Sequence, residues 1–372
     1  MRERDLSLLP TGADEAAWAE AERQMKADGE HLPERQRAML AQSMAHERSN
    51  REALYADRAR YPVIARQDVG DPLMVIGLPR SGTTLLHGLL AQDPRARSPL
   101  AWETHSWSPP PGLDPKADAR RIAEAQARAD AIPEEMLARH RSGPFLPEEC
   151  ESAILNLAFM GMVNWARFGL DAHTDWVNHH QADLAAGFRL HRHALQHLQT
   201  FSPREWWVLK SPTDLFYLDA RLAEYPGTRF VWLHRDPAEV LPSVVSLVHF
   251  VRQMSGLDPD PVALAERSVA LWAEGMAAAM AVRAAHPRPG QFIDVHHGDV
   301  SRDPIGAVRR IYDHYGLTLT DEAETAMLAF MAANGKGKHG GHHYTAEQFG
   351  LTKAGLRERF AEYIETFGVE TR

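Results

Sequence analysis

The residues best suited to chemistry in this sequence form the loop Gly77-Leu-Pro-Arg-Ser-Gly-Thr-Thr84, in which four residues separate two glycines. The apolar run 73–78 predicts a strand that is buried on both faces, and residues 85–90 predict a helix. A glycine loop between a strand and a helix suits an anion, because backbone N–H groups and the positive end of the helix dipole point at it. We therefore expect a bound phosphate to contact Pro79, Arg80, Ser81, Gly82, Thr83 and Thr84.

The end of this loop departs from the pattern that nucleoside triphosphatases require. Those enzymes place a lysine and then a serine or threonine after the second glycine, whereas Thr83 follows Gly82 here. The cationic side chain of the loop is Arg80, which lies inside the turn. A short, doubly anionic group such as a phosphosulfate fits this arrangement better than a triphosphate. The alternative interpretation is an ordinary glycine turn with a surface arginine.

Two further cations follow predicted strands. Lys210 comes after the apolar pair at 208–209, and Arg235 comes after the buried run 229–234, with Ser243 eight residues further on. A guanidinium forms bidentate bonds with phosphate, and a hydroxyl near a helix start adds a donor. The carboxyl ends of parallel strands share one edge of a sheet, so Arg80, Lys210 and Arg235 are expected to converge there. Alternatively, Lys210 is ion-paired or snorkels, while Arg235 pairs with Asp236 or Glu239 and Ser243 bonds to its own helix.

Strands that alternate with helices are predicted throughout this part of the chain. Besides 73–78, strands are expected at 206–209, 229–234 and 291–296. Ser211-Pro212 and Asp236-Pro237 are each interpreted as an N-cap followed by proline at the first helical position. The pattern predicts a three-layer α/β/α fold with a central parallel sheet.

The remaining segments are mainly helical in composition and spacing. Residues 12–60 predict helices with a break at Pro33, and we divide the chain into a helical extension, 1–70, and a main domain, 71–372. Within the main domain, residues 105–200 predict a mainly helical insertion. We expect that insertion to carry the pocket for a second substrate.

Composition excludes several classes of protein. With 44% hydrophobic and 24% charged residues, the 372-residue chain matches folded globular proteins rather than disordered or fibrous ones. The net charge of -9 disfavours nucleic acid as a partner. Cys150 is the single cysteine, so an internal disulfide is excluded. Since no secretory signal or membrane-spanning run is evident, we expect a cytoplasmic protein.

Several ordered motifs together resemble the sulfotransferase superfamily, in particular its bacterial-type branch related to the tyrosylprotein enzymes. The likeness runs through the loop at 77–86, Asp93-Pro94, Leu100-Ala-Trp-Glu103, Trp207-Val-Leu-Lys-Ser-Pro212, His234-Arg-Asp-Pro-Ala-Glu-Val240 with Ser243, His342-His-Tyr344 and Phe349-Gly-Leu351. The resemblance implies a fold like that of the P-loop-containing nucleoside triphosphate hydrolases. It also implies 3′-phosphoadenosine 5′-phosphosulfate (PAPS) as the sulfate donor and 3′-phosphoadenosine 5′-phosphate (PAP) as its product.

The resemblance assigns roles to individual residues. The loop would hold the 5′-phosphosulfate, with Arg80 among the catalytic residues, and Arg235 and Ser243 would bind the 3′-phosphate. Lys210 would contact the oxygen that bridges phosphate and sulfate, where charge builds in the transition state. A loop over the nucleotide would supply contacts from Lys336, Lys338 and Tyr344, although a solvated loop explains these three nearly as well.

Sulfuryl transfer also needs a group that removes the proton of the acceptor. Glu103 stands where the tyrosylprotein branch carries its catalytic glutamate, with slightly different spacing, and His105 is the rival, because cytosolic small-molecule enzymes use histidine. A surface carboxylate that caps the turn is the plain alternative for Glu103. Three more carboxylates could line the pocket or simply be solvated, namely Glu148, Glu149 and Glu151.

The sequence thus predicts in-line transfer of a sulfuryl group to a hydroxyl or amine, without a metal. A kinase-like nucleotide phosphotransferase and an inactive nucleotide-binding protein are the alternatives. His193 and His197 share a helical face, but hydrogen bonding explains them better than metal binding. The acceptor is expected to be a small or lipid-like molecule, with only a weak hint from Trp102, Trp107, Trp165 and Trp176. A homodimer is one option for the oligomeric state, which the sequence leaves open.

Overall fold

Five parallel strands form one sheet in the order β2-β3-β1-β4-β5. A computed structural model describes residues 9–139, 143–147, 153–333 and 345–371 of the chain. The strands are β1 (Leu73–Gly77), β2 (Ala96–Arg97), β3 (Trp206–Lys210), β4 (Arg229–His234) and β5 (Phe292–His296). The four strands predicted from the sequence are confirmed, whereas β2 has only two residues and gives no readable pattern.

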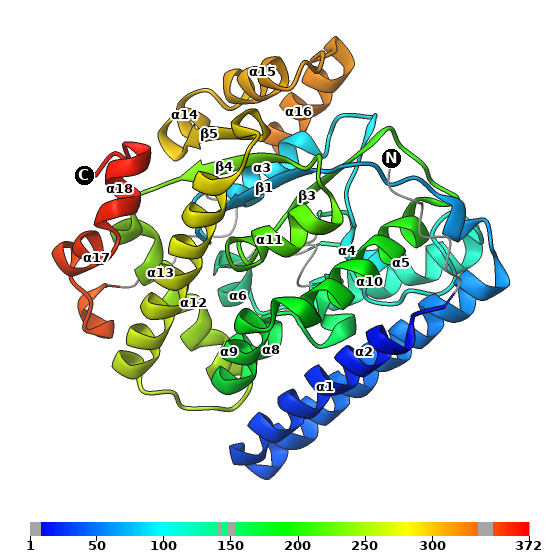
Figure 1. Cartoon of the computed structure of the whole chain (residues 1–372), viewed down its shortest axis with the longest axis horizontal. Helices are drawn as coiled ribbons and strands as arrows, with labels where there is room; N and C mark the ends of the chain where they lie inside the picture. The colour runs from blue at the N-terminus through cyan, green and yellow to red at the C-terminus, as the bar shows by residue number, and fades with distance from the viewer. Residues whose placement is uncertain (1–8, 140–142, 148–152, 334–344, 372) are drawn as a thin grey trace.

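The sheet is covered on both faces, which follows from the alternation of side chains along each strand. Leu73 and Val75 of β1 pack in one apolar cluster, and Met74 and Ile76 pack in a second cluster on the opposite face. The first face is covered by α3 (Thr83–Leu90), α15 (Pro304–His314) and α16 (Asp321–Ala333), and the second by α11 (Asp214–Glu224), α12 (Pro237–Met254) and α13 (Pro261–Ala285). Figure 1 shows these layers, and the predicted three-layer α/β/α fold is confirmed.

The start of α12 was predicted correctly and the start of α11 was not. Asp236 caps Ala238 at 2.9 Å, and Pro237 begins α12. After β3, however, the Ser211 hydroxyl accepts a hydrogen bond from the backbone N–H of Thr213 at 3.1 Å, and α11 begins only at Asp214. The hydroxyl therefore stabilises a turn before the helix rather than the first turn of the helix itself.

Two N-terminal helices, α1 (Gly12–Asp28) and α2 (Glu34–Arg60), form a hairpin that breaks near Pro33 as predicted. It lies along α10 (Gln181–Gln199), as Figure 1 shows. Buried polar contacts join the two parts: the Tyr55 hydroxyl bonds Nδ1 of His193 at 2.9 Å, and Arg58 donates to Gln196 at 2.7 Å. Such contacts tie the hairpin firmly to the rest of the chain, because buried polar groups are costly to separate.

The region between β2 and β3 is helical, in agreement with its sequence. It contains α4 (Ala101–Thr104), α5 (Pro115–Asp130), α6 (Glu134–Arg139), α8 (Val163–Phe168), α9 (Asp171–His179) and α10. After β5 come α14 (His297–Arg302), α15 and α16, and the chain ends in α17 (Lys353–Arg359) and α18 (Ala361–Phe367). Across the described ranges, none of the helices has the length and apolar composition needed to cross a membrane.

Candidate active site

The loop after β1 has a backbone that only certain residues allow. Gly77 has φ +140°, and a Cβ atom there would lie 2.3 Å from the carbonyl oxygen of Leu233 on β4. Gly82 has φ +101° and forms the N-cap of α3. Arg80 adopts φ +68°, a left-handed conformation that costs a non-glycine residue about 1–3 kcal/mol. Such strain persists where surrounding contacts hold it, and it is common at functional sites.

Residues of this loop divide into those that build it and those that face outward. Ser81 is fully buried, and its hydroxyl donates to the carbonyl of Leu78 at 2.6 Å, so this side chain holds the turn together. Thr83 is also buried, whereas Thr84 is exposed and Pro79 is half-buried. The first-turn N–H groups of α3 point out of such a turn and can receive an anion.

Arg80 is joined to both residues that the sequence assigns to a second anion. Its Nε donates to the Ser243 hydroxyl on α12 at 3.2 Å, and its backbone carbonyl accepts from Nη1 of Arg235 at 3.0 Å. Arg235 follows β4 directly, and Ser243 lies two turns into α12. The loop after β1 and the start of α12 thus meet at one edge of the sheet, as their place at neighbouring strand ends predicts.

Arg235 also makes the ion pair that the sequence offered as its alternative interpretation. Its Nε and Nη2 both lie 3.1 Å from Oε2 of Glu239, whereas Asp236 pairs with Arg357 instead. Its guanidinium carries five N–H donors, more than these contacts use. The pair with Glu239 and an anion can therefore share one guanidinium, and the two interpretations do not exclude each other.

Lys210 is the last residue of β3 and is only 2% exposed. It lies in register with Val75 of β1, so its position is at the same edge as the loop that β1 leads into. A buried ammonium group next to a bound anion would act in a medium where charge is poorly screened, which strengthens its effect.

Glu103 is buried in an ion pair. It is 2% exposed, and its Oε1 and Oε2 accept from Nη2 and Nη1 of Arg97 at 2.7 and 3.1 Å. Its Oε2 also accepts from the backbone N–H of Leu100 at 2.9 Å, which caps α4. A carboxylate has about four lone-pair sites, so these three contacts leave room for one more donor.

His105, the rival base, has different surroundings. The residue is exposed to solvent, and its ring lies 4.9 Å from that of His46 on α2. Although the residue as a whole is exposed, packing around the ring and the positive charge of Arg128 lower the pKa of His105 to about 4, so the imidazole is neutral at physiological pH and is a weak proton acceptor. The side chain of Asn50 on α2 donates to its carbonyl at 3.2 Å, which brings the N-terminal hairpin to this segment.

One neighbour of the loop was missed by sequence reasoning. The ring of His297, the first residue of α14, donates from Nδ1 to the carbonyl of Ser81 at 2.9 Å. A Cβ atom on Gly82 would lie 2.9 Å from that same nitrogen. The sequence does place His297 directly after the fourth predicted strand. Because that strand ends at the same edge of the sheet, this position was the available signal.

Other residues singled out in the sequence have structural surroundings or fall outside the described ranges. The rings of His193 and His197 bond the Tyr55 hydroxyl and the carbonyl of Trp107. Of the four tryptophans, Trp176 is partly buried against the core. The other three are buried, namely Trp102, Trp107 and Trp165. The residues outside the described ranges are Glu148, Glu149, Cys150, Glu151, Lys336, Lys338 and Tyr344.

A family model described as "Sulfotransferase family" matches residues 72–321 of the chain. The match begins just before β1 and runs to the start of α16, so it includes the loop, β3, β4 and all of α12. It covers more than half of the chain.

Characterised and solved proteins agree with this match. The omega-hydroxy-beta-dihydromenaquinone-9 sulfotransferase Stf3 of Mycobacterium bovis is 24% identical over 318 residues, which cover 82% of this chain and 78% of that protein. The crystal structure of sulfotransferase STF1 from Mycobacterium tuberculosis superposes with a TM-score of 0.80 at 26% identity, over 96% of this chain and 94% of that one. The structure of STF9 from Mycobacterium avium gives 0.82 at 25% identity, over 97% and 93%.

Proposed function

We propose that this chain, which belongs to the sulfotransferase family, moves the sulfuryl group of PAPS to a hydroxyl group of an acceptor. An amine is the second acceptor chemistry compatible with the same reaction. The donor differs from ordinary adenine nucleotides in its 3′-phosphate, so the proposal requires two anion sites that lie one nucleotide apart.

The contact of Arg80 with both Ser243 and Arg235 carries this proposal. The separations of 3.2 and 3.0 Å join the 5′ loop to the two residues proposed for the 3′-phosphate. We assign the 5′-phosphosulfate to the backbone of residues 79–84 with Arg80, and the 3′-phosphate to Arg235 and Ser243. Two guanidinium groups suit these anions because they form charge-assisted, bidentate hydrogen bonds.

The proposed chemistry is one in-line displacement at sulfur. An acceptor oxygen forms a bond to sulfur while the bond between sulfur and the bridging oxygen breaks, which releases PAP and the sulfated acceptor. Lys210 stabilises the negative charge that builds on the bridging oxygen as that bond breaks. Arg80 stabilises the oxygens of the transferring group, and the acceptor proton passes to a base.

Glu103 is our proposed base, and His105 is the second candidate. The remaining lone pair on the Glu103 carboxylate could take the acceptor proton, although the two hydrogen bonds from Arg97 already occupy two of its roughly four lone-pair sites. The exposure of His105 to solvent favours the alternative, whereas its lowered pKa makes the imidazole a weaker base. The variants E103Q and H105N distinguish them: loss of the base lowers kcat by about 10²–10⁴-fold, whereas loss of the other residue leaves kcat within a few-fold.

For the acceptor we propose an alcohol on an apolar, lipid-like molecule. The support is the relative Stf3 of Mycobacterium bovis, which is named a sulfotransferase of omega-hydroxy-beta-dihydromenaquinone-9. We assign the acceptor to the side of the sheet edge that is formed by α4 and the helices up to α10, next to Glu103 and His105. A screen of small alcohols, phenols and long-chain alcohols with labelled PAPS tests this class directly.

Calorimetry with PAP and AMP tests the donor assignment. We expect PAP to bind at least about tenfold more tightly than AMP, because the two differ only in the 3′-phosphate that Arg235 and Ser243 would hold. Equal affinity for the two nucleotides would exclude the proposal. Magnesium-dependent turnover of ATP without any transfer from PAPS would instead support the kinase-like alternative.

A further inference from the structure

The C-terminal helices hold the turn that follows β4. Arg357 of α17 donates two hydrogen bonds to Oδ2 of Asp236, at 2.7 and 3.1 Å. The Tyr363 hydroxyl of α18 lies 3.3 Å from the backbone nitrogen of Arg235 and 3.2 Å from Nδ1 of His234. Three consecutive residues of the turn are thus bonded to a segment more than 120 residues later in the chain.

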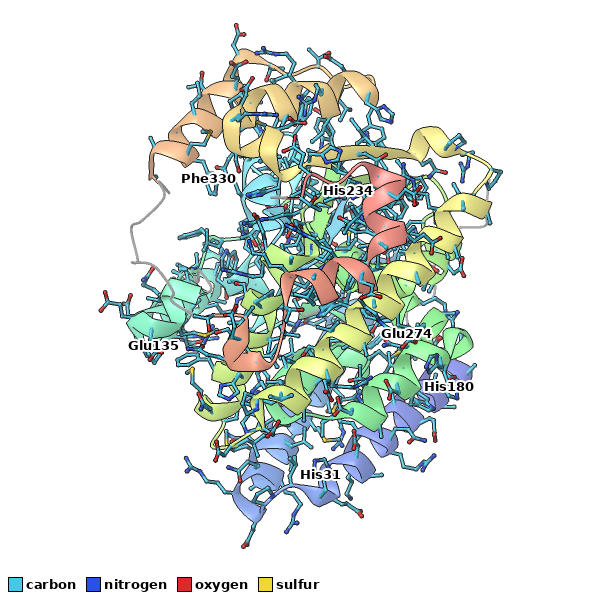
Figure 2. The ribbon with its side chains drawn as sticks, turned by 90° about the vertical axis from the view of Figure 1, so that its left-hand side faces the viewer. His31, Glu135, His180, His234, Glu274 and Phe330 are labelled. Atoms are coloured by element: carbon cyan, nitrogen blue, oxygen red, sulfur yellow. The ribbon has the colours of Figure 1, made fainter. Side chains whose placement is uncertain are left out.

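The bonds around Tyr363 fix the position of each proton. A carboxylate can only accept, so the single proton of a neutral His234 lies on the nitrogen that faces Asp294. Nδ1 therefore accepts the proton of the Tyr363 hydroxyl, while that oxygen accepts from the Arg235 N–H. The proton of His234 then lies on Nε2, which donates to Asp294 at 2.8 Å. Burial lowers the pKa of His234, in agreement with this neutral form, and Figure 2 shows His234 beside the ribbon of α18.

Both ends of this chain of bonds are anchored. Asp294 on β5 accepts two hydrogen bonds from Arg283 of α13, at 2.6 and 2.7 Å. Tyr363 is 2% exposed and packs edge-on or tilted against Phe360 and Phe367. A buried network in which each member has its partner is rigid, so the backbone nitrogen of Arg235 has little freedom to move.

Arg357 acts on the start of α12 in a similar way. Asp236 is buried and caps α12 through its other oxygen, which accepts from the Ala238 N–H at 2.9 Å. The two bonds from Arg357 balance the charge of this carboxylate and fix its orientation. The direction of α12, and with it the place of Ser243, depends on that cap.

We infer that Tyr363 and Arg357 are positioning residues for the 3′-phosphate site, and that they set the preference of the protein for nucleotides with a 3′-phosphate. This inference rests on the proposed function, in which Arg235 and Ser243 bind that phosphate. Both positioning residues lie beyond residue 321, where the match to the family model ends.

The expected effect on affinity follows from what each nucleotide contacts. Replacing Tyr363 by phenylalanine leaves the N–H of Arg235 and Nδ1 of His234 without this hydroxyl, so the turn is free to shift. A shift of the turn moves the guanidinium of Arg235 relative to Glu239 and to the carbonyl of Arg80. In the structure this guanidinium lies 3.0 Å from that carbonyl. AMP has no 3′-phosphate, so its affinity does not depend on that placement.

The test is the ratio of the AMP and PAP dissociation constants, measured by calorimetry on the full chain. For Y363F we expect this ratio to fall about tenfold, and for R357Q about threefold or more, with AMP affinity unchanged within about twofold. R357K should recover part of the loss because it keeps the charge. The matched control is R359Q, at an exposed arginine on the same helix, and its ratio should equal that of the wild type.

Melting temperatures of the same variants distinguish a loss of folding from a loss of positioning. Arg357 is 30% exposed, so R357Q is expected to fold even if Y363F does not. A ratio that stays at the wild-type value in the folded variants would overturn the inference and leave the proposed function intact. A wild-type protein that does not prefer PAP to AMP would overturn the proposed function and the inference with it.

Discussion

Replacing Arg97 by methionine would leave the buried carboxylate of Glu103 without its partner. The pair has hydrogen bonds of 2.7 and 3.1 Å, and the two side chains are 7% and 3% exposed. Breaking a buried ion pair by removing one partner costs about 3–5 kcal/mol. With an unfolding entropy near 2.1 cal/mol/K per residue, 372 residues give about 0.8 kcal/mol/K, so the R97M variant should melt about 4–6 °C lower.

Differential scanning calorimetry at pH 7 measures this change, with R120M as the matched control. Arg120 and Glu124 form an exposed pair 3.8 Å apart, so R120M should change the unfolding free energy by less than about 1 kcal/mol. The double variant R97M/E103Q should be more stable than R97M, because it no longer buries an unpaired charge. A loss for R97M no larger than that for R120M would refute the description of Glu103 as a buried, paired carboxylate.

Two further predictions concern catalysis and pH. K210M should lower kcat by about 10²–10³-fold while the dissociation constant of PAP changes by less than about fivefold, since the ammonium acts mainly on charge that develops in the transition state. Equal losses in both constants would contradict that role. Burial raises the pKa of Glu47 to about 7, so the stability that its protonated form provides is complete below about pH 4.5 and is lost as pH rises through 7. The melting temperature of E47Q minus that of the wild type should therefore increase between pH 5 and 8. A difference that stays constant across this range would disprove the pKa shift.

The sequence predicted those parts of the fold that depend on local pattern. The run that became β1 is apolar throughout, and those of β3 and β4 are apolar except for charged or polar residues at their ends, a composition typical of strands buried on both faces. β5 lies at the edge of the sheet and is only partly buried, and its run includes Asp294 and His296. The glycines at 77 and 82 correspond to positive φ angles and a close approach to β4, which few other residues tolerate. The Asp-Pro pair that begins α12 was equally readable.

Contacts between distant segments were not predictable in this way. The sequence around Glu103 does not reveal its ion pair with Arg97. Arg97 lies in β2, which has two residues and is too short to show a pattern of its own. The bond of His297 to Ser81 spans 216 residues, and that of Tyr363 to Arg235 spans 128. Such pairs form only once the sheet brings strand ends together, so sequence reasoning could indicate the shared edge but not the partners along it.

The most direct test of the central claim is transfer of labelled sulfate from PAPS to an added acceptor. Wild-type protein is incubated with ³⁵S-labelled PAPS and a long-chain alcohol, and both sulfated product and PAP are measured over time. We predict acceptor-dependent formation of the two products in equal amounts, with the rate in K210M reduced about 10²–10³-fold. Absence of labelled product from every alcohol, phenol and amine tested, despite tight binding of PAP, would contradict a sulfotransferase and support a nucleotide-binding protein without chemistry.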